Sequence, residues 1–251
     1  SVGTLASLAA PLVPKLAKAL LLPLLEAFSD EEPGVRMAAI EAVSRLEDVA
    51  GDRAVRHLAK ALEDELEEED VRVAAATALG KCGNSDAACA ALITVLEDSN
   101  WDVRAAAAAA AIKLGKGLAP FASAIAKLLS NADAGVREKA LEVLGSMGGD
   151  ASAAAPAIAS LLEDSSCGVR TAAVGALAKL GPISKPSLRS IEALLHHESL
   201  GVRFSAVEAL GALGALAVPA MPSLSEALRD EDWGVRELAS DVLKLLEARD
   251  P

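Results

Sequence analysis

Residues 164–181 read DSSCGVRTAAVGALAKLG, and close variants of this stretch recur along the chain. A Val-Arg dipeptide marks each copy. Its arginines are Arg36, Arg72, Arg104, Arg137, Arg170, Arg203 and Arg236. The intervals between them are 36, 32, 33, 33, 33 and 33 residues, so the sequence contains seven copies of one repeat at nearly constant spacing.

Positions counted from each arginine show the period of a helix. The residue at −1 is valine and the residue at +3 is alanine in all seven copies, and positions +7 and +10 are apolar. This spacing predicts one buried face of an α-helix. Position +11 is glycine in five copies, which predicts a C-cap with positive φ. The five are Gly83, Gly115, Gly148, Gly181 and Gly214. Position −2 is glycine or aspartate, and we expect it to be the N-cap.

A further helix is expected before each of these. Ile158, Leu161 and Leu162 form an apolar stripe ahead of Arg170, and Pro156 lies near the start of that stripe, where a first helical turn tolerates proline. One helix pair cannot bury its own apolar face, whereas stacked pairs can. The sequence therefore predicts an all-α protein, a right-handed α-solenoid of about seven helix pairs of about 33 residues.

The pattern D-x-x-x-x-V-R-x-x-A-x-x-A-L-x-x-L-G, as it stands in residues 164–181, resembles HEAT repeats. It is similar in particular to the short HEAT-like repeats of the bilin lyases of phycobilisome assembly. The resemblance covers about residues 16–248. It implies a fold used mostly by adaptors and scaffolds, with a few enzymes among them.

We expect a single solenoid domain over residues 1–251. Residues 1–15 are expected to form a partial or capping N-terminal helix whose apolar side contacts a partner or a preceding segment, because a solenoid needs a polar cap. A start at Ser1 without methionine is expected of a processed or trimmed N-terminus. The predicted repeats are 16–51, 52–83, 84–115, 116–148, 149–181, 182–214 and 215–251.

Composition limits the function. The formal net charge is −12, which argues against nucleic acid, since phosphate binding needs a basic surface. The negative charge also disfavours binding to anionic membrane surfaces. No uninterrupted apolar run is long enough to span a membrane, so we expect no membrane insertion. A basic protein partner remains compatible with this charge. Three cysteines without a CxxC motif predict neither a disulfide framework nor a zinc site and favour a reducing compartment, in a cell or an organelle.

An acidic or polar residue stands six positions before most of the arginines. These residues are Asp30, Asp98, Asn131, Asp164, His197 and Asp230, and Asp64 takes the role in the second copy, where the loop is longer. We expect the aspartates to cap the second helices and the arginines to bridge to an aspartate of their own or the adjacent repeat. The alternative is an arginine row that reads a carboxylate or phosphate ligand. Arg203 and then Arg137 are its best candidates, because their own columns hold His197 and Asn131.

Other residues are candidates for partner binding. Trp101, Trp233 and Phe204 are rare aromatics at predicted surface columns, where they could anchor an interface. Glu138, Glu142 and Glu208 lie at columns +1 and +5, which face away from the predicted core. Glu67, Glu68 and Glu69 belong to an acidic run that is either a solvated loop or a docking patch for a basic partner.

No catalytic constellation stands out. HEAT-repeat deoxyhypusine hydroxylase binds two irons through several His-Glu pairs, whereas this chain has only His197-Glu198 and a distant His57. We therefore expect no metal and no cofactor. The sequence favours a non-catalytic scaffold, adaptor or assembly subunit of a larger complex. The alternative is a bilin-lyase-like enzyme or cofactor chaperone that acts with a partner subunit and binds its ligand near Arg203 and Phe204. A designed repeat protein is disfavoured by the uneven loops.

Overall fold

The computed structural model describes residues 12–46, 51–82, 85–182 and 185–248, and these ranges contain helices and connecting loops without a strand. The chain forms two compact units, residues 1–118 and residues 119–251. No observation tests the predicted single domain or the predicted repeat boundaries. The predicted N-terminal partial helix lies mostly outside the described residues, since the first described helix begins at Leu12.

The first unit holds three helix pairs. Its α-helices are α2 (Leu12–Glu26), α3 (Pro33–Ser44), α4 (Gly51–Glu63), α5 (Glu69–Leu79), α6 (Asp86–Thr94) and α7 (Trp101–Leu114). Short 3-10 helices follow α2, α6 and α7, namely η1 (Ala27–Ser29), η3 (Val95–Glu97) and η4 (Gly115–Phe121), and the last of these continues into the second unit.

The second unit holds four helix pairs. Its α-helices are α8 (Ala122–Lys127), α9 (Ala134–Met147), α10 (Ala155–Ser160), α11 (Cys167–Leu180), α12 (Lys185–Ala193), α13 (Leu200–Leu213), α14 (Met221–Ala227) and α15 (Trp233–Glu247). Its 3-10 helices are η5 (Leu128–Ser130), η6 (Gly148–Ala154), η7 (Leu161–Glu163), η8 (Leu194–His196) and η9 (Gly214–Ala220). Proline explains why the first helices start irregularly: Pro219 lies in η9, and Pro156 stands in the first turn of α10.

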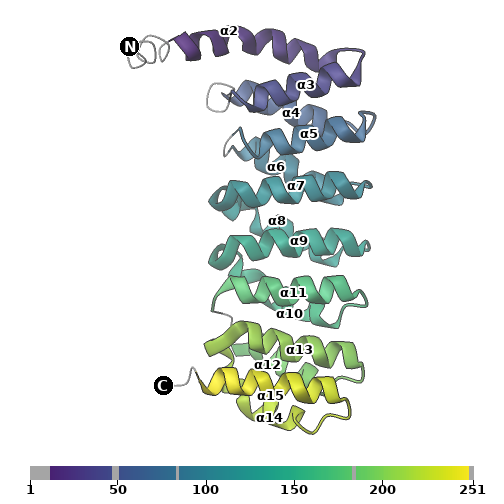
Figure 1. Ribbon diagram of the computed structural model, residues 1–251, viewed down its shortest axis with the longest axis vertical. Helices are drawn as coiled ribbons and strands as arrows, with labels where there is room; N and C mark the ends of the chain where they lie inside the picture. The colour runs from purple at the N-terminus through teal and green to yellow at the C-terminus, as the bar shows by residue number, and fades with distance from the viewer. Residues whose placement is uncertain (1–11, 47–50, 83–84, 183–184, 249–251) are drawn as a thin grey trace, which may run out of the picture. The chain divides into compact units, whose positions relative to one another are not determined.

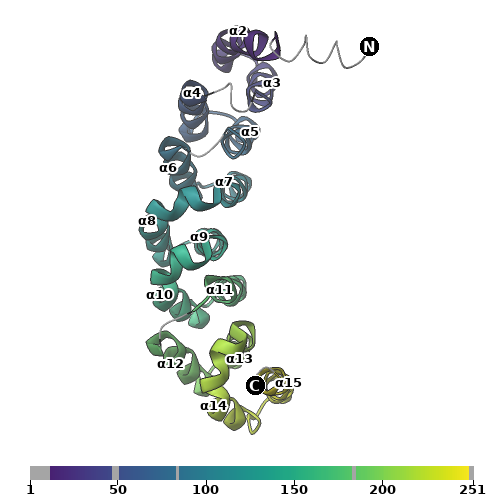
Figure 2. The same cartoon turned by 90° about the vertical axis from the view of Figure 1, so that its left-hand side faces the viewer.

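Within each unit the helices alternate between two layers (Figure 1 and Figure 2). The second helix of every pair carries the Val-Arg dipeptide, and these helices, α3, α5 and α7 in the first unit, lie in one layer. The first helices α4 and α6 lie in the other layer. The second unit repeats the arrangement, with α9, α11, α13 and α15 in one layer and α8, α10, α12 and α14 in the other.

The predicted helical face is the core of both units. The alanine at +3 is buried in every copy, from 5% exposed at Ala39 to 0% at Ala239, and Leu177 at +7 is 0% exposed. A small residue at +3 lets consecutive second helices approach closely. Val35 is the exception to the −1 column, because it is 43% exposed in the first helix pair, whereas the other six valines are buried.

The helix ends show one confirmed prediction and one error. Gly115, Gly148, Gly181 and Gly214 have φ of 56°, 57°, 79° and 56°, as the predicted C-caps require, and Gly83 lies outside the described residues. The N-cap is at −4 and not at the predicted −2. Side chains at −4, in Asn100, Asp133 and Asp232, accept hydrogen bonds from backbone N–H groups of the first helical turn. The helices begin at −3, one residue before the expected cap.

These stacked pairs confirm the predicted α-solenoid fold. By length and composition alone, one stretch of the described residues, Leu200–Ala227, is apolar enough to cross a membrane, and half of it is buried in the protein. That stretch is divided into α13, η9 and α14, which take part in the helix pairs of the second unit. Core helices of soluble proteins share this composition, so the stretch is weak support for a membrane span.

Candidate functional site

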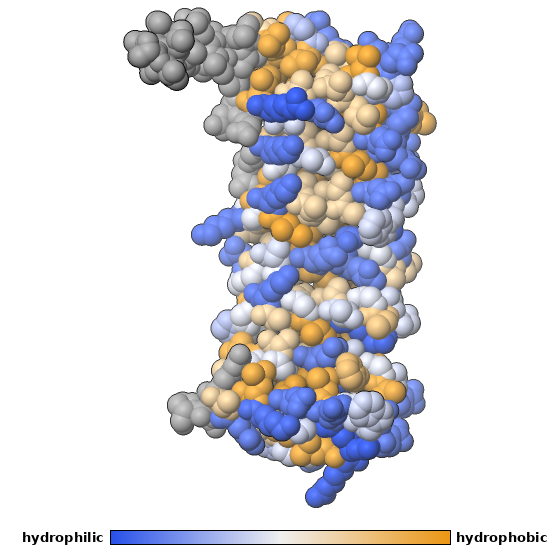
Figure 3. All heavy atoms as spheres, in the orientation of Figure 1, coloured by the Kyte–Doolittle hydropathy of each residue, from blue (hydrophilic) through white to orange (hydrophobic). Residues whose placement is uncertain are grey.

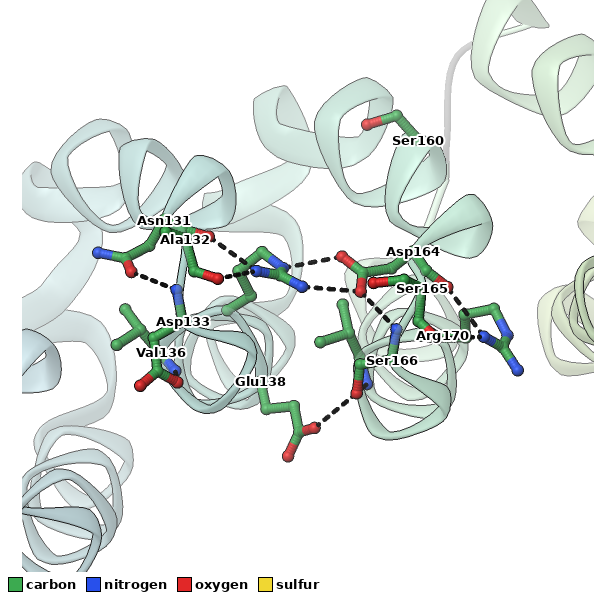
Figure 4. Close-up of polar contacts among 12 residues, drawn as sticks. Asn131, Ala132, Asp133, Val136, Glu138, Ser160, Asp164, Ser165, Ser166 and Arg170 are labelled. Atoms are coloured by element: carbon green, nitrogen blue, oxygen red, sulfur yellow. Dashed lines mark hydrogen bonds and ion pairs between the residues drawn. The ribbon is translucent and has the colours of Figure 1, made fainter.

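Six of the seven Val-Arg arginines bind the loop that precedes their own helix, whereas Arg72 donates from Nε to the Leu62 carbonyl oxygen in α4 at 3.2 Å. In Arg137, Nη1 donates to the carbonyl oxygens of Asn131 and Ala132 at 2.8 and 3.0 Å. Arg170 binds Asp164 and Ser165 in the same way, at 2.8 and 3.3 Å, as Figure 4 shows. The same two carbonyl positions are bound by Arg36, Arg104, Arg203 and Arg236. The arginine therefore fixes the turn between the two helices of one pair.

In three of the arginines the rest of the guanidinium reaches the aspartate of the following pair. Arg137 binds Asp164 through Nε and Nη2, both at 2.8 Å, and Arg203 binds Asp230 at 2.7 and 3.0 Å. In the first unit, Arg72 pairs with Asp98. These side chains are at most 12% exposed, so little water competes for the ion pairs. Each pair is a bidentate or close link between two consecutive repeats. We call this series of contacts the arginine–aspartate ladder.

The aspartate also holds its own loop. Asp164 accepts a hydrogen bond from the Ser166 N–H at 2.8 Å, visible in Figure 4, and Asp230 accepts one from Asp232 at 2.9 Å. Burial opposes the charge on Asp164, but hydrogen bonds from Arg137 and from the Ser166 N–H outweigh burial and lower its pKa. The pKa of Asp230 is lowered by the same balance of burial against Arg203 and the Asp232 N–H. The predicted capping role is thus an N–H contact in the loop before the helix.

The first contact of the ladder, made by Arg36, departs from the prediction. Arg36 donates from Nη2 to Glu67 at 2.6 Å and also binds Glu68. Asp64, predicted for this position, instead accepts a hydrogen bond from the Leu66 N–H at 3.0 Å. The longer second loop carries Asp64 past the place where the other copies put their aspartate, and Glu67 fills it. Glu67, predicted as part of a solvated or docking loop, is only 12% exposed, whereas Glu69 is exposed.

The arginines bridge to the adjacent repeat, as one form of the expectation had it, and the alternative in which Arg203 and Arg137 lack carboxylate partners is wrong. His197 and Asn131 stand in the aspartate column that precedes these arginines, and the partners are Asp230 and Asp164 of the next pair. Instead, the Nε of Arg170 is buried without a hydrogen-bond partner in the described chain, as is the Nε of Arg104. The column ahead of Arg170 holds His197, whose Nδ1 accepts from the Ser199 N–H at 3.0 Å.

The exposed face of the second helices is hollowed between neighbours. A groove of about 430 Å³ lies between α9 and α11 and includes Glu138, Glu142, Gly145, Gly175 and Lys179 in its lining. A groove of about 530 Å³ lies between α3 and α5. Columns +1 and +5 line both grooves. Figure 3 views this face, where hydrophobic residues of α5 and α7 are flanked by hydrophilic ones.

Small residues at +8 lie where consecutive second helices touch. A Cβ added at Gly145 would lie 2.9 Å from the Ala176 backbone, and one at Gly80 would lie 2.9 Å from the Ala110 backbone. Glycine is therefore needed where the two helices touch. This column was not predicted, although its glycines at 80, 145 and 211 recur with the repeat.

The predicted aromatic and acidic candidates are distributed over both units. Trp101 and Trp233 are the first residues of α7 and α15 and are 57% and 67% exposed. Phe204 and Glu208 lie on α13 and are half-buried, and burial raises the pKa of Glu208. Glu138 lies beside the Ser166 hydroxyl, which donates to it at 3.4 Å.

No group of three or more histidine, cysteine, aspartate or glutamate side chains is placed to hold a metal ion within the described ranges. Cys89 and Cys167 form no disulfide bond. Cys89 is buried, with Sγ 3.6 Å from the Gly117 carbonyl, and burial raises the pKa of its thiol. Cys167 is exposed at the start of α11.

The sequence matches HEAT repeats over residues 65–125, 121–191 and 156–244, and a single HEAT repeat over residues 20–50. The chain belongs to the HEAT-repeat family. No curated protein matches it significantly.

Solved structures share the fold. Importin beta is 17% identical with a TM-score of 0.65, and the match covers 94% of this chain and 37% of that one. A structure of Kap95p with RanGDP gives 14% identity, a TM-score of 0.66, and coverage of 93% and 37%. This chain thus spans little more than a third of those two proteins. Phycocyanin lyase from Nostoc sp. is 26% identical over 93% of this chain and 94% of that one, but with a TM-score of only 0.47.

Proposed function

We propose that this protein is a non-catalytic scaffold or adaptor that binds a protein partner along the face of its second helices. HEAT-repeat solenoids are typical interaction scaffolds. The observation that carries the proposal is the groove between α9 and α11, whose counterpart between α3 and α5 is built from the same columns. A repeated groove suits an extended or helical segment that contacts several repeats in succession.

The α9–α11 groove favours a partner with basic and small apolar side chains. Gly145 and Gly175 add no side chain to its floor, and Glu138 and Glu142 also line it. Further carboxylates at the same columns follow on α15, at Glu237 and Asp241. The net charge of −12 would also accelerate the approach of a basic partner, in a salt-dependent manner. Exposed Trp101 and Trp233 are suited to anchor such contacts, since aromatic side chains dominate interface energetics.

The bilin-lyase-like alternative depended on a free Arg203, and Arg203 is not free. Arg203 is 8% exposed at its side chain, and Asp230 and Glu231 already occupy its Nε and Nη2. An anionic cofactor at this site would have to displace two carboxylates. The absence of catalysis remains part of the proposal, and purification with a stoichiometric pigment or metal would favour the alternative.

Affinity capture from the native source, with cross-linking and mass spectrometry, tests the scaffold. The E138Q/E142Q variant should lose the captured partner, and cross-links in the wild-type protein should map to α9 and α11. The E163Q/E226Q variant removes two carboxylates from first-helix positions in the other layer and should retain the partner. Equal loss in both variants, or cross-links confined to the first helices, would contradict this binding face.

A further inference from the structure

One edge of the second unit carries a row of exposed apolar side chains. The helices α11, α13 and α15 begin at Cys167, Leu200 and Trp233, so these residues occupy the same position in three consecutive copies of the repeat. Trp233 is 67% exposed, Leu200 is 46% exposed, and Cys167 is also exposed. We call these three side chains the edge row. A single exposed apolar residue is ordinary, whereas three at equivalent positions form a continuous surface feature.

The packing of the helices sets the spacing of the edge row. Helices α11, α13 and α15 lie side by side in one layer and run in the same direction, so their first residues share one edge of it (Figure 1 and Figure 2). A Cβ added at Gly211 of α13 would lie 2.8 Å from a methyl group of Val242 on α15, so these helices are in direct contact. Helices packed in this way lie about 8–10 Å apart, and the side chains of the edge row follow one another at about that interval.

The same positions of the first unit are occupied differently. Helices α3, α5 and α7 begin at Pro33, Glu69 and Trp101. The carboxylate of Glu69 therefore stands where a continuous row would need an apolar side chain. Trp101 is 57% exposed, which makes it a matched control for an exposed tryptophan whose preceding second helix begins with a charge.

The surroundings of the edge row are acidic. The eight residues that end at each Val-Arg arginine, 163–170, 196–203 and 229–236, contain six carboxylates, four arginines and two histidines, which leaves two negative charges when the histidines are neutral. Glu231 binds Arg203, yet its side chain is 85% exposed. A partner segment should therefore carry basic residues next to its apolar ones.

The spacing of the edge row matches a polyproline II helix. This conformation has three residues per turn and rises about 3.1 Å per residue, so every third side chain lies on one face at intervals of about 9 Å. A β-strand repeats a face every second residue, at about 7 Å. An α-helix repeats a face at about 5.4 Å, so only alternate turns would meet the row. Exposed aromatic side chains such as Trp233 are also typical of surfaces that bind proline-rich segments.

We infer that the edge row binds a proline-rich segment of a protein partner in the polyproline II conformation, with an apolar residue at every third position and basic residues at both ends. Such a segment is extended before it binds, so little conformational entropy is lost on binding. This binding surface goes beyond the proposed scaffold face. Cys167 also lines the groove between α9 and α11, but Leu200 and Trp233 are not among the residues that line it.

The test is fluorescence anisotropy of labelled peptides titrated with the purified protein. The peptide KKLPPLPPLPPLPPKK has a leucine at every third position, and KKLPLPPPPLPLPPKK has the same composition with its leucines spread around the helix. We expect saturable binding of the first peptide and at least about tenfold weaker binding of the second. Glutamates in place of the lysines should weaken the first peptide severalfold at low salt. Equal affinity for all three peptides, or no binding of the first, would overturn the inference.

Single substitutions then locate the site. Trp233→Ala should weaken the first peptide by about tenfold, whereas Trp101→Ala should stay within about twofold of the wild type. Leu200→Gln should weaken it severalfold, and Leu245→Gln, which alters a leucine 40% exposed near the other end of α15, should not. All four side chains are exposed, so circular dichroism should show an intact fold in each variant. Equal losses at the two tryptophans, or unchanged affinity in either Trp233→Ala or Leu200→Gln, would contradict binding at the edge row.

The E138Q/E142Q variant separates this inference from the scaffold proposal. It should lose the captured partner of the second-helix face and keep wild-type affinity for the leucine–proline peptide. Failure of the peptide titration therefore leaves the scaffold proposal standing, and failure of the partner capture leaves the edge row standing.

Discussion

Arg137 and Asp164 join two consecutive helix pairs by a bidentate ion pair with two N–O distances of 2.8 Å. At the same time Arg137 fixes the loop of its own pair, and Asp164 accepts the Ser166 N–H of the next. One contact therefore ties together two loops and two repeats. The stacking of repeats depends on this link as well as on apolar burial.

Removing Arg137 should be costly. Arg137→Ala leaves Asp164 nearly buried without its countercharge, and we expect a loss of about 3 kcal/mol in the free energy of unfolding. Arg45→Ala is the control, because Arg45 is 78% exposed and pairs with Glu41 at 3.7 Å, so its loss should be below about 0.5 kcal/mol. Urea unfolding followed by circular dichroism measures both. Equal destabilisation would mean that the ladder is incidental.

The Nε of Arg170 lacks a hydrogen-bond partner in the described chain and should bind a carboxylate placed beside it. His197→Asp places an aspartate in the column that Asp164 and Asp230 occupy, where it can bind the unpartnered Nε of Arg170 and the Ser199 N–H. We expect a gain of about 1–3 kcal/mol, the value of a charge-assisted hydrogen bond in a buried setting. Thermal and urea unfolding measure it.

His196→Asp adds the same charge one position earlier, at the end of η8 and outside the column, where the side chain is 61% exposed. It should give no gain. If the two variants have equal stability, Arg170 does not lack a carboxylate in any energetic sense.

The apolar columns make a simple stability prediction. Leu177 on α11 is 0% exposed, and Leu177→Ala should cost about 2–5 kcal/mol because it leaves a cavity between packed helices. Leu200→Ala removes the same atoms from a side chain that is 46% exposed, and it should cost much less. A loss under about 0.5 kcal/mol at Leu177 would contradict the assignment of this column to the core.

The repeat period predicted the helices and their buried faces, because burial at +3 and +7 leaves a direct record in residue type. Gly148 and Gly214 were predictable as C-caps for the same reason, since few other residues adopt positive φ. It was not predictable from the sequence whether each arginine binds the aspartate of its own repeat or that of the next. Asp164 recurs at a constant distance from both Arg137 and Arg170, so periodicity alone cannot choose between them. Only the backbone geometry, which commits Nη1 of Arg170 to the Asp164 carbonyl, makes the choice.

Burial and loop length account for the remaining errors. Val35 has the sequence of a core column but lies in the first described helix pair, where it stays 43% exposed. Glu67 has the sequence of a solvated acidic loop, yet the longer connection after α4 brings it to Arg36. Neither the exposure of Val35 nor the contact of Glu67 can be predicted from residue type.

The ladder should make the protein sensitive to acid. Asp164 and Asp230 have pKa values below the ordinary aspartate value, which is about 3.9 in an unfolded chain. Protons therefore bind the unfolded state more readily, so the stabilisation is complete above about pH 4 and is lost as the pH falls further. Unfolding free energies measured from pH 7 to pH 3 should decline most steeply below about pH 4.

The D164N/D230N variant tests the source of that decline. It should be less stable at pH 7 and should lose less on acidification, because two of the groups that bind protons on unfolding are gone. Asp241→Asn changes a carboxylate that is 67% exposed and should keep the wild-type dependence. An unchanged decline in D164N/D230N would assign the acid sensitivity to other carboxylates.

Two glycines on neighbouring helices should respond to alanine with opposite signs. Gly145→Ala puts a methyl group 2.9 Å from the Ala176 backbone, where α9 and α11 touch, and the overpacking should cost about 1–3 kcal/mol. Gly175 lies inside α11 with no atom within 4 Å of an added Cβ, so Gly175→Ala should stabilise the helix by about 0.5–1 kcal/mol. Urea unfolding of both variants measures the difference. Destabilisation by Gly175→Ala would show that this groove position is constrained, and a neutral Gly145→Ala would show that the two helices can separate at little cost.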